Sequence, residues 1–252
     1  MGRVMTGGLL TVVVAAKDPD ARQLNRCIAA FAALASATRI QILLVLSGKA
    51  APLDSALTSA FCSFDILQTP PHGVYAAYNT GIDHAQCPFT LFFGVDDIAL
   101  PAMDAACAAL GQEPFDVYAA SCYMQGKGLR SPSLDRRSLI RANWCQQGVF
   151  YATARLAKQR FDTRYPIQAD HKLNIELVAD PSTRLGIQSE PVAYFSLGGV
   201  SSQRHDLNFV RDFPAIVGAA YGRPTGLYWA LRQKVSVLLY GPLEQRYGNA
   251  KS

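Results

Sequence analysis

The sequence predicts a single α/β domain in which a mostly parallel sheet has helices on both faces. Short apolar runs alternate with stretches in which apolar residues recur at helical spacing, an order typical of parallel sheets. The 252 residues, half of them hydrophobic, are enough for one large core. The charged fraction of 17% is too low for an intrinsically disordered chain.

The first half of the chain is the most regular. Four apolar runs are predicted to be strands: residues 9–16, 40–46, 64–68 and 89–95. After the first run, Asp18, Pro19 and Asp20 form a helix-start signal, in which a carboxylate caps the helix and proline occupies its first position. A second helix is predicted over residues 74–85, between the third and fourth strands.

The second half is less regular. Helices are predicted at residues 101–110, 169–179, 207–221 and 226–240, and strands at 116–123, 148–151 and 192–197. Residues 125–143 are rich in Gly, Pro, Ser and Arg, which predicts a surface loop able to act as a lid. We therefore expect one domain over residues 1–252, with a core of about 9–202 and a helical segment of about 203–252.

Composition limits the function classes. The net charge of +5 suits an anionic small molecule or an anionic lipid surface, and no Lys/Arg stripe interleaved with aromatics suggests nucleic acid. The six cysteines are scattered without a CxxC pair, so we expect reduced thiols. No apolar stretch reaches the roughly 20 residues that span a bilayer. These features predict a cytoplasmic protein.

Two adjacent acids, Asp96 and Asp97, directly follow the strand predicted at 89–95. Ligands of open α/β sheets bind beyond the carboxyl ends of the strands. Two neighbouring carboxylates repel each other, and a divalent cation such as Mg²⁺ or Mn²⁺ would relieve that repulsion. The alternative is that Asp97 only caps the turn before Pro101.

Four segments in order carry a resemblance: residues 70–82 (PPHGVYAAYNTGI), 92–97 (FFGVDD), 145–151 (CQQGVFY) and 161–171 (FDTRYPIQADH). Together they resemble family 2 glycosyltransferases with the GT-A fold, especially the bacterial branch that builds exopolysaccharide and colanic-acid-like repeats. The resemblance covers about residues 9–202. It implies a metal-dependent, inverting hexosyltransferase that moves a sugar from a nucleoside-diphosphate sugar to a hydroxyl of a glycan or lipid-linked acceptor in polysaccharide biosynthesis.

The resemblance also implies roles for single residues. Asp97 resembles the last acid of the metal motif, and Asp96 the acid that contacts the ribose or supports that site. Asp170 resembles the catalytic base, although an acid at a helix start is also a common N-cap. Tyr75 and Asn79 lie one helical turn apart on one face, which the family places beside the donor. The alternative for Tyr75 is a core aromatic.

Weaker candidates are His72, His171 and His205, of which His205 could help to hold metal or phosphate. Residues 198–201 (GGVS) resemble a segment that closes over the donor. The family usually has a base-reading acid where this chain has Ser47-Gly48-Lys49, and Asp18 is expected to substitute as a polar contact.

Further departures from the family pattern are Ala76, where relatives often have an acid, and Gly94, where many have Asp or Asn. They leave open a second function class, a degenerate member that binds a nucleotide-sugar or a partner without turnover. A nucleotidyltransferase and a nucleotide-dependent oxidoreductase are disfavoured, because neither a phosphate loop nor GxGxxG follows the first strand.

The last predicted helix mixes apolar residues with Arg232 and Lys234. Such a helix can lie in a membrane interface and bring an enzyme to a lipid-linked acceptor. The alternative, a terminal helix packed on the domain, is slightly favoured. The expected location is therefore the cytoplasm, with peripheral contact at the inner membrane left open.

Overall fold

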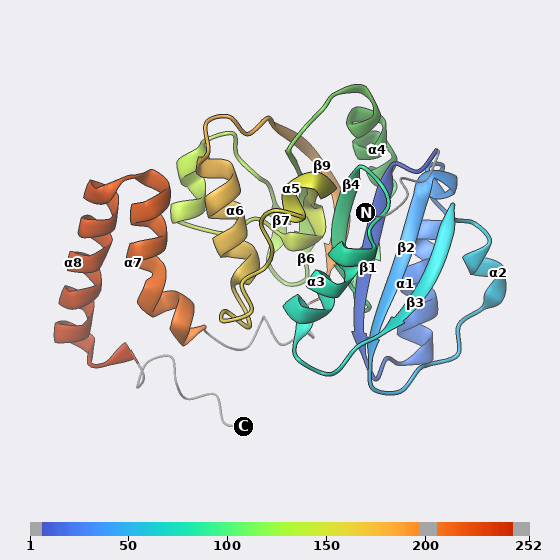
Figure 1. The fold of residues 1–252 in the computed structure, drawn as a ribbon, viewed down its shortest axis with the longest axis horizontal. Helices are drawn as coiled ribbons and strands as arrows, with labels where there is room; N and C mark the ends of the chain where they lie inside the picture. Colours follow the sequence, from blue (N-terminus) through green and yellow to red (C-terminus); the bar gives the residue numbers. More distant parts are fainter. Residues whose placement is uncertain (1–6, 197–205, 244–252) are drawn as a thin grey trace.

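The computed structural model describes residues 7–196 and 206–243, and nine strands form one sheet in the order β3-β2-β1-β4-β8-β6-β9-β5, with β7 paired to β6 (Figure 1). The strands are β1 (Leu10–Lys17), β2 (Ile40–Ser47), β3 (Ser63–Gln68), β4 (Phe89–Gly94), β5 (Ile98–Ala99), β6 (Val117–Met124), β7 (Gly128–Arg130), β8 (Val149–Ala152) and β9 (Leu185–Phe195).

The first four strands of this order run parallel, as predicted, and β6 runs parallel to β9. However, β8 is antiparallel to both β4 and β6, and the short β5 is antiparallel to β9. The sheet is therefore mixed but mostly parallel. In β1, Leu10 pairs with Ile40 of β2 and Phe89 of β4, so these strands end at one edge.

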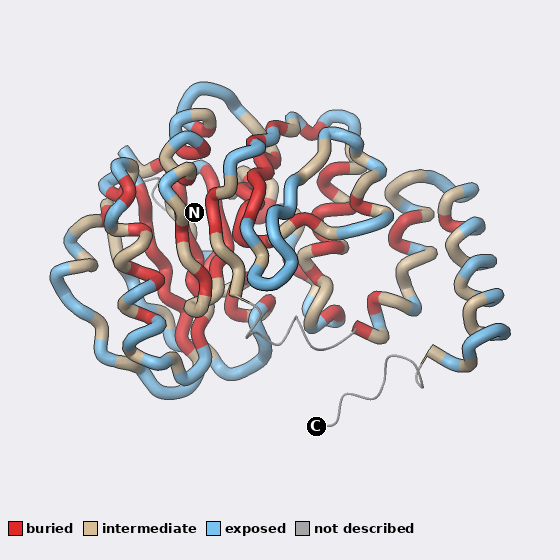
Figure 2. The backbone as a smooth tube through the Cα atoms, turned by 180° about the vertical axis from the view of Figure 1, so that it is seen from behind, coloured by how far each residue is buried: buried red, intermediate tan, exposed pale blue. Residues whose placement is uncertain are grey.

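The helices are α1 (Ala21–Ala32), α2 (Ser55–Thr58), α3 (Val74–His84), α4 (Met103–Gln112), α5 (Thr153–Leu156), α6 (Ala169–Ala179), α7 (Leu207–Tyr221) and α8 (Arg223–Tyr240). Because side chains alternate along a strand, Val12 and Val14 of β1 belong to a core shared with α1 and α4. Val13 belongs to the opposite core, shared with α3, α6 and α7. Figure 2 shows the buried strands between these layers.

The structure corrects the predicted start of the first helix. Asp20 is the N-cap of α1, and its side chain accepts hydrogen bonds from the backbone N–H groups of Arg22 and Gln23. Asp18 instead follows the last residue of β1 and has a φ of 43°, in the left-handed region that non-glycine residues rarely adopt. Proline therefore precedes the cap and does not occupy the first helical position.

Residues 125–143 are not simply the predicted surface loop. They contain β7 and the 3₁₀ helix Arg136–Ile140, in which Leu139 is fully buried. Arg136 donates hydrogen bonds to the carbonyl oxygens of Val178 in the last turn of α6 and of Asp180 and Thr183 in the segment that follows it. These contacts satisfy carbonyls that a helix end leaves without partners, and they fix the segment against the domain.

The C-terminal helices form a hairpin that lies beside α6 at one end of the molecule (Figure 1). The bounds predicted for α7 agree with the structure, whereas α8 begins three residues earlier than predicted. The expected boundary between core and helical segment, at about residue 202, lies outside the described residues. No helix among the described residues has the length and apolarity needed to cross a membrane.

Candidate active site

Asp97 lies just beyond β4 with its carboxylate directed into the protein. Its Oδ2 accepts hydrogen bonds from Gln147 Nε2 at 2.7 Å and from the Gly94 N–H at 3.2 Å, and its Oδ1 accepts one from the Ser196 N–H at 3.0 Å. The residue is 1% exposed. Burial and, to a smaller extent, the neighbouring charge of Asp96 raise the pKa of Asp97 to about 7.

Asp96 is partly exposed, and the two carboxylates meet over Gly94. A Cβ atom added to Gly94 would lie 2.6 Å from Asp96 Oδ1 and 2.9 Å from Asp97 Oδ2. A larger residue at this position would therefore displace at least one of the acids. Gly94, which departs from the family pattern, therefore allows the Asp96 and Asp97 carboxylates to lie close together.

Asp170 lies in the first turn of α6, but it is not the N-cap. Gln168 holds that position and makes no side-chain capping bond. Asp170 Oδ1 accepts hydrogen bonds from the Tyr75 hydroxyl and from the His171 N–H, both at 2.8 Å, and Oδ2 accepts one from Asn143 Nδ2 at 2.8 Å. Burial raises the pKa of Asp170 to about 6, although these hydrogen bonds lower it.

The Tyr75 hydroxyl has two acceptors and only one hydrogen. It lies 2.8 Å from Asp170 Oδ1 and 2.8 Å from the Ile167 carbonyl oxygen. When Asp170 is ionised, the hydroxyl can donate to it. When Asp170 carries a proton, the hydroxyl can turn to Ile167 and accept from the acid. Tyr75 is thus placed to serve both protonation states of Asp170.

Buried polar side chains connect the Asp170 end of the site to the turn that holds Asp97. Asn143 Oδ1 accepts a hydrogen bond from Asn174 Nδ2 at 2.9 Å, and the Tyr151 hydroxyl donates to Asn174 Oδ1 at 2.7 Å. The same hydroxyl lies 3.4 Å from Oε1 of Gln146, the residue next to Gln147. The network therefore runs from Asp170 to Gln146, and the next residue in the chain, Gln147, holds Asp97.

The electrostatics of Tyr78 show that the three acids share one neighbourhood. Burial raises the pKa of this phenol well above its usual range. The charges of Asp97, Asp170 and Asp96 each raise it further, because negative charge nearby disfavours a phenolate. Each of the carboxylates that the sequence grouped by family resemblance therefore lies near Tyr78, and their roles in one site stay predictions.

The remaining predicted residues have other contacts. Asn79 makes two hydrogen bonds with the backbone of Phe161: its Nδ2 donates to the carbonyl oxygen, and its Oδ1 accepts from the N–H. These bonds attach α3 to the segment that leads to Asp170. Asn79 and Tyr75 do share a face of α3, as expected. Asp18 is exposed, and its Oδ1 accepts a hydrogen bond from the Lys49 N–H at 2.8 Å. The donor-binding roles of Tyr75, Asn79, Asp96 and Asp18 stay predictions.

The histidines divide between structural and exposed positions. His171 is buried, stacks on Phe209, and places Nε2 2.7 Å from the Leu139 carbonyl oxygen. His72 is exposed. His205 and residues 198–201, which were expected to help close the site, lie outside the described residues.

The acid pair fits a cation site in which the substrate would supply the remaining ligands. Within residues 7–196 and 206–243, no cluster of three or more His, Cys, Asp or Glu side chains could hold a metal ion. Mg²⁺ is commonly bound through one or two carboxylates together with substrate phosphates, not by an all-protein cage. Asp96 and Asp97 are the residues that would supply such a pair of hard oxygen ligands.

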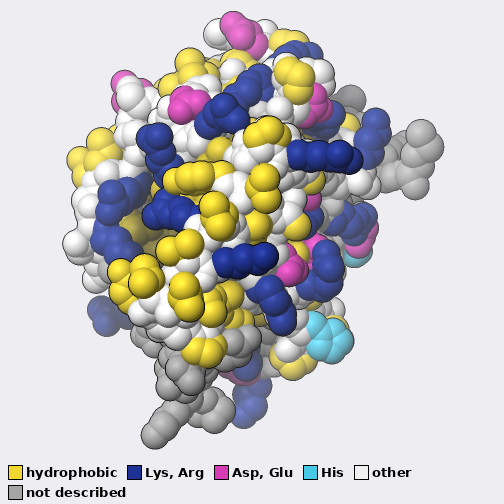
Figure 3. Space-filling model, turned by 90° about the vertical axis from the view of Figure 1, so that its left-hand side faces the viewer, with side chains coloured by type: hydrophobic (Ala, Val, Ile, Leu, Met, Phe, Trp, Pro, Cys, Tyr) yellow, Lys and Arg dark blue, Asp and Glu magenta, His cyan; other side chains and the backbone are white. Residues whose placement is uncertain are grey.

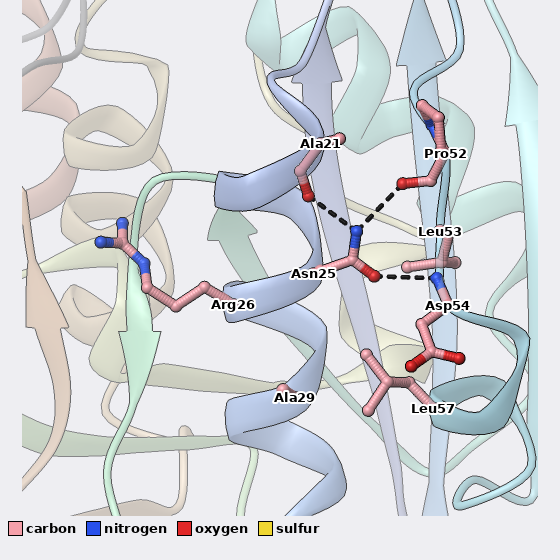
Figure 4. A pocket seen from close by; sticks show the side chains of 8 residues that line it. All are labelled: Ala21, Asn25, Arg26, Ala29, Pro52, Leu53, Asp54 and Leu57. Carbon is pink, nitrogen blue, oxygen red and sulfur yellow. Dashed lines mark hydrogen bonds between the residues drawn. The ribbon is translucent and has the colours of Figure 1, made fainter.

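A cavity of about 660 Å³ lies elsewhere, between α1 and the loop before α2 (Figure 4). The Asn25 side chain bonds there to Ala21, Pro52 and Asp54, whereas Arg26 points away and donates to the Asp96 carbonyl oxygen at 3.3 Å. None of the predicted carboxylates lines this cavity.

The sequence did not identify the partners of the acids. Asn143 falls in the segment predicted to be a surface loop, and no local pattern marks it. Gln147 falls in a segment that the family resemblance singled out, so it could have been assigned to the site. Its contact with Asp97, which is 50 residues away, could not be read from spacing.

Known proteins resemble this chain in sequence and in fold. The model of the family described as "Glycosyl transferase family 2" matches residues 11–170. Glycosyltransferases of PGL/p-HBAD biosynthesis from Mycobacterium bovis and Mycobacterium tuberculosis are 31% identical over 150 residues, which are 56% of this chain and 58% of theirs. The chain thus spans less than two thirds of the length of these relatives.

Solved structures show the same fold at low identity. The structure of S. aureus TarS superimposes with a TM-score of 0.65 and 15% identity, over 84% of this chain and 40% of that one. The structure of TarS 1–349 with UDP-GlcNAc gives a TM-score of 0.64 and 16% identity, over 84% of this chain and 67% of that one. The family match covers well over half of the sequence, and the chain therefore belongs to glycosyl transferase family 2.

Proposed function

We propose that this glycosyltransferase inverts the anomeric centre as it moves a hexose from a nucleoside-diphosphate sugar to an acceptor hydroxyl. The observation that supports the proposal is that Asp96, Asp97 and Asp170 all lie near enough to the buried Tyr78 phenol for their charges to raise its pKa. An inverting transfer needs a diphosphate site on one side of the sugar and a base on the other. The UDP and UDP-GlcNAc complexes of TarS 1–349 support a nucleotide-sugar donor.

Asp170 is proposed as the base. Above pH 6 it is mainly ionised, so it can take the proton of the acceptor hydroxyl as the oxygen attacks the anomeric carbon. Tyr75 and Asn143 fix its two oxygens, and the second acceptor of the Tyr75 hydroxyl accommodates the proton once it has been transferred. The raised pKa brings the base closer to neutrality, where proton transfer is most efficient.

Asp96 and Asp97 are proposed to hold Mg²⁺ or Mn²⁺. When bound, the cation would stabilise the negative charge of the departing diphosphate as a Lewis acid. Asp97 is fixed by three hydrogen bonds, and Asp96 is the more exposed of the two acids. Asp18, at the same edge of the sheet, is proposed as a polar contact for the nucleoside.

The acceptor is proposed to be a hydroxyl of a glycan or of a lipid-linked glycan in bacterial polysaccharide biosynthesis, used at the cytoplasmic side of the inner membrane. The mycobacterial relatives are named for PGL/p-HBAD biosynthesis, which supports a glycan-transfer role in general terms. The colanic-acid-type branch stays a prediction.

A donor screen tests the proposal. UDP-, GDP- and dTDP-sugars are added with and without Mn²⁺, and both thermal stabilisation and nucleotide release in the presence of acceptors are measured. We expect one nucleotide class to stabilise the protein only with metal, and nucleotide to be released only with a suitable acceptor. Binding without release across a panel of acceptors would favour the degenerate, non-catalytic alternative. Failure of every nucleotide-sugar to bind would overturn both.

A further inference from the structure

Helix α8 presents an apolar face that no described part of the chain covers. Its exposed large hydrophobic residues are Leu227, Tyr228, Leu231, Val235, Leu238, Leu239 and Tyr240. Leu238 is 84% exposed and Leu227 is 73% exposed. Figure 3 views this end of the molecule and shows hydrophobic side chains gathered between Lys and Arg side chains. Such a large exposed apolar patch marks an interaction surface.

The arrangement around the helix is ordered. At 3.6 residues per turn, six of these side chains fall within an arc of about 120°: Leu227, Tyr228, Leu231, Val235, Leu238 and Leu239. By the same spacing, Arg223 and Lys234 border one edge of the arc and Arg232 borders the other. α8 contains no Asp or Glu. We call this arc with its three cations the α8 face.

Packing of the opposite side fixes the orientation of the α8 face. A Cβ atom added to Gly226 would lie 2.8 Å from Gly218 Cα, so α7 and α8 approach each other closely at this point. Further along, the Trp229 ring meets Phe213 edge-on at 5.1 Å, and Gln233 Nε2 donates to the Val210 carbonyl oxygen at 2.7 Å. The helix therefore cannot turn its apolar side inward without losing these contacts.

We propose that the α8 face docks onto an anionic lipid bilayer. An interfacial helix places apolar side chains at the acyl boundary while flanking Lys and Arg side chains reach the headgroups. The three cations and the absence of acids on α8 complement a negatively charged surface. A second copy fits less well, because a symmetric contact through the α8 face would bring together two sets of cations with no acid on either helix.

Docking through this face would also orient the proposed active site. The Asp206 side chain, at the start of α7, accepts hydrogen bonds from the N–H groups of Ile167 and Gln168, just before Asp170. The Tyr165 hydroxyl donates to Asp212 Oδ2 at 2.9 Å. The helical hairpin and the segment that carries the base are thus joined by direct bonds. The inference itself does not depend on the proposed transfer reaction.

Vesicle co-sedimentation tests the inference on the full chain, without nucleotide-sugar or metal. Neutral phosphatidylcholine vesicles are compared with vesicles containing 30% phosphatidylglycerol, chosen as an estimate of a bacterial anionic fraction. We expect binding to the anionic vesicles that weakens with salt. The double variant Leu231→Asp/Leu238→Asp should bind at least about tenfold more weakly. Lys234→Gln should bind about fivefold more weakly.

Ile66→Asp is the matched control, because Ile66 is 52% exposed on β3 at the other end of the molecule (Figure 1). It should bind vesicles as the unmodified chain does. Circular dichroism checks that each variant is folded, and both leucines are exposed enough for the double variant to fold. Size-exclusion chromatography with light scattering gives the mass of each protein.

Equal binding by the double variant and Ile66→Asp would overturn the proposal, as would the absence of any vesicle binding. A dimer of the unmodified chain that the double variant abolishes, with no vesicle binding, would assign the α8 face to self-association instead. Vesicle binding and molecular mass are measured without turnover. Their outcome is therefore independent of whether the proposed transferase activity is correct.

Discussion

Asp97 and Asp170 are both acids whose pKa burial raises, but their partners are of different kinds. Asp97 accepts from two backbone N–H groups and one amide, and the backbone donors cannot reverse to accept a hydrogen bond. Asp170 accepts from a phenol that has a second acceptor within reach. The fixed donors around Asp97 favour its ionised form, although burial and Asp96 raise its pKa to about 7, whereas the partner of Asp170 can serve both protonation states.

This contrast separates two tasks within one neighbourhood. An acid held by fixed donors beside another acid is suited to a cation, which relieves their repulsion. An acid with an adjustable partner is suited to proton transfer. The following substitutions test whether the two acids differ in this way.

The largest effect is expected for Asp170→Asn, which removes the base and keeps the shape of the side chain. Transfer should fall by roughly 10³-fold, within the range for a lost general base. Donor affinity should change little, because the proposed base faces the acceptor hydroxyl and not the nucleotide. Turnover and donor titration measure the two effects, with Asp65→Asn on β3 as a control. Near-normal turnover by Asp170→Asn would remove the assignment.

The next effect is expected for Gly94→Ala. The added methyl would lie 2.6 Å from Asp96 Oδ1, so the two carboxylates must separate. We expect metal-dependent donor affinity to weaken by about tenfold, because a cation would lose one of two ligands. Calorimetric titration of the nucleotide-sugar with and without Mn²⁺ measures this. An unchanged metal dependence would argue that the acid pair does not bind the cation.

A smaller effect is expected for Tyr75→Phe, and it should depend on pH. The hydrogen bond from Tyr75 lowers the pKa of Asp170, so its loss should raise that pKa above about 6. The acidic limb of the pH–rate profile should therefore move to higher pH. Activity should fall several-fold near pH 6 and much less at pH 8. A uniform loss across pH would point to a packing defect in place of a change in protonation.

The smallest effect concerns the stability of the folded state. Because the pKa of Asp97 is about 7 in the folded protein and near 4 when unfolded, the folded state binds more protons between these values. The Asp97 contribution to stability therefore declines as pH rises from about 4 to 7. Asp97→Asn removes this titration, so its Tm relative to the unmodified chain should increase over that interval. Thermal unfolding at several pH values measures the difference, and a constant difference would contradict it.

The sequence by itself determined the layered fold and the order of its elements. Periodicity and capping act over a few residues, so α6 and α7 could be given their bounds directly. The acids after β4 could also be recognised, because their position at a strand end is a local property. The antiparallel direction of β8 could not, since a four-residue strand does not encode the orientation of its neighbours.

Only the tertiary structure decided which side chains surround the acids. Gln147 reaches Asp97 across 50 residues, and Asn143 reaches Asp170 across 27, through a segment whose composition predicts a surface loop. The tertiary structure also decided that the apolar arc of α8 faces outward, because the close contact between Gly218 and Gly226 turns the opposite side of α8 toward α7. Contacts of this kind depend on how distant segments pack together, and local residue patterns do not encode that packing.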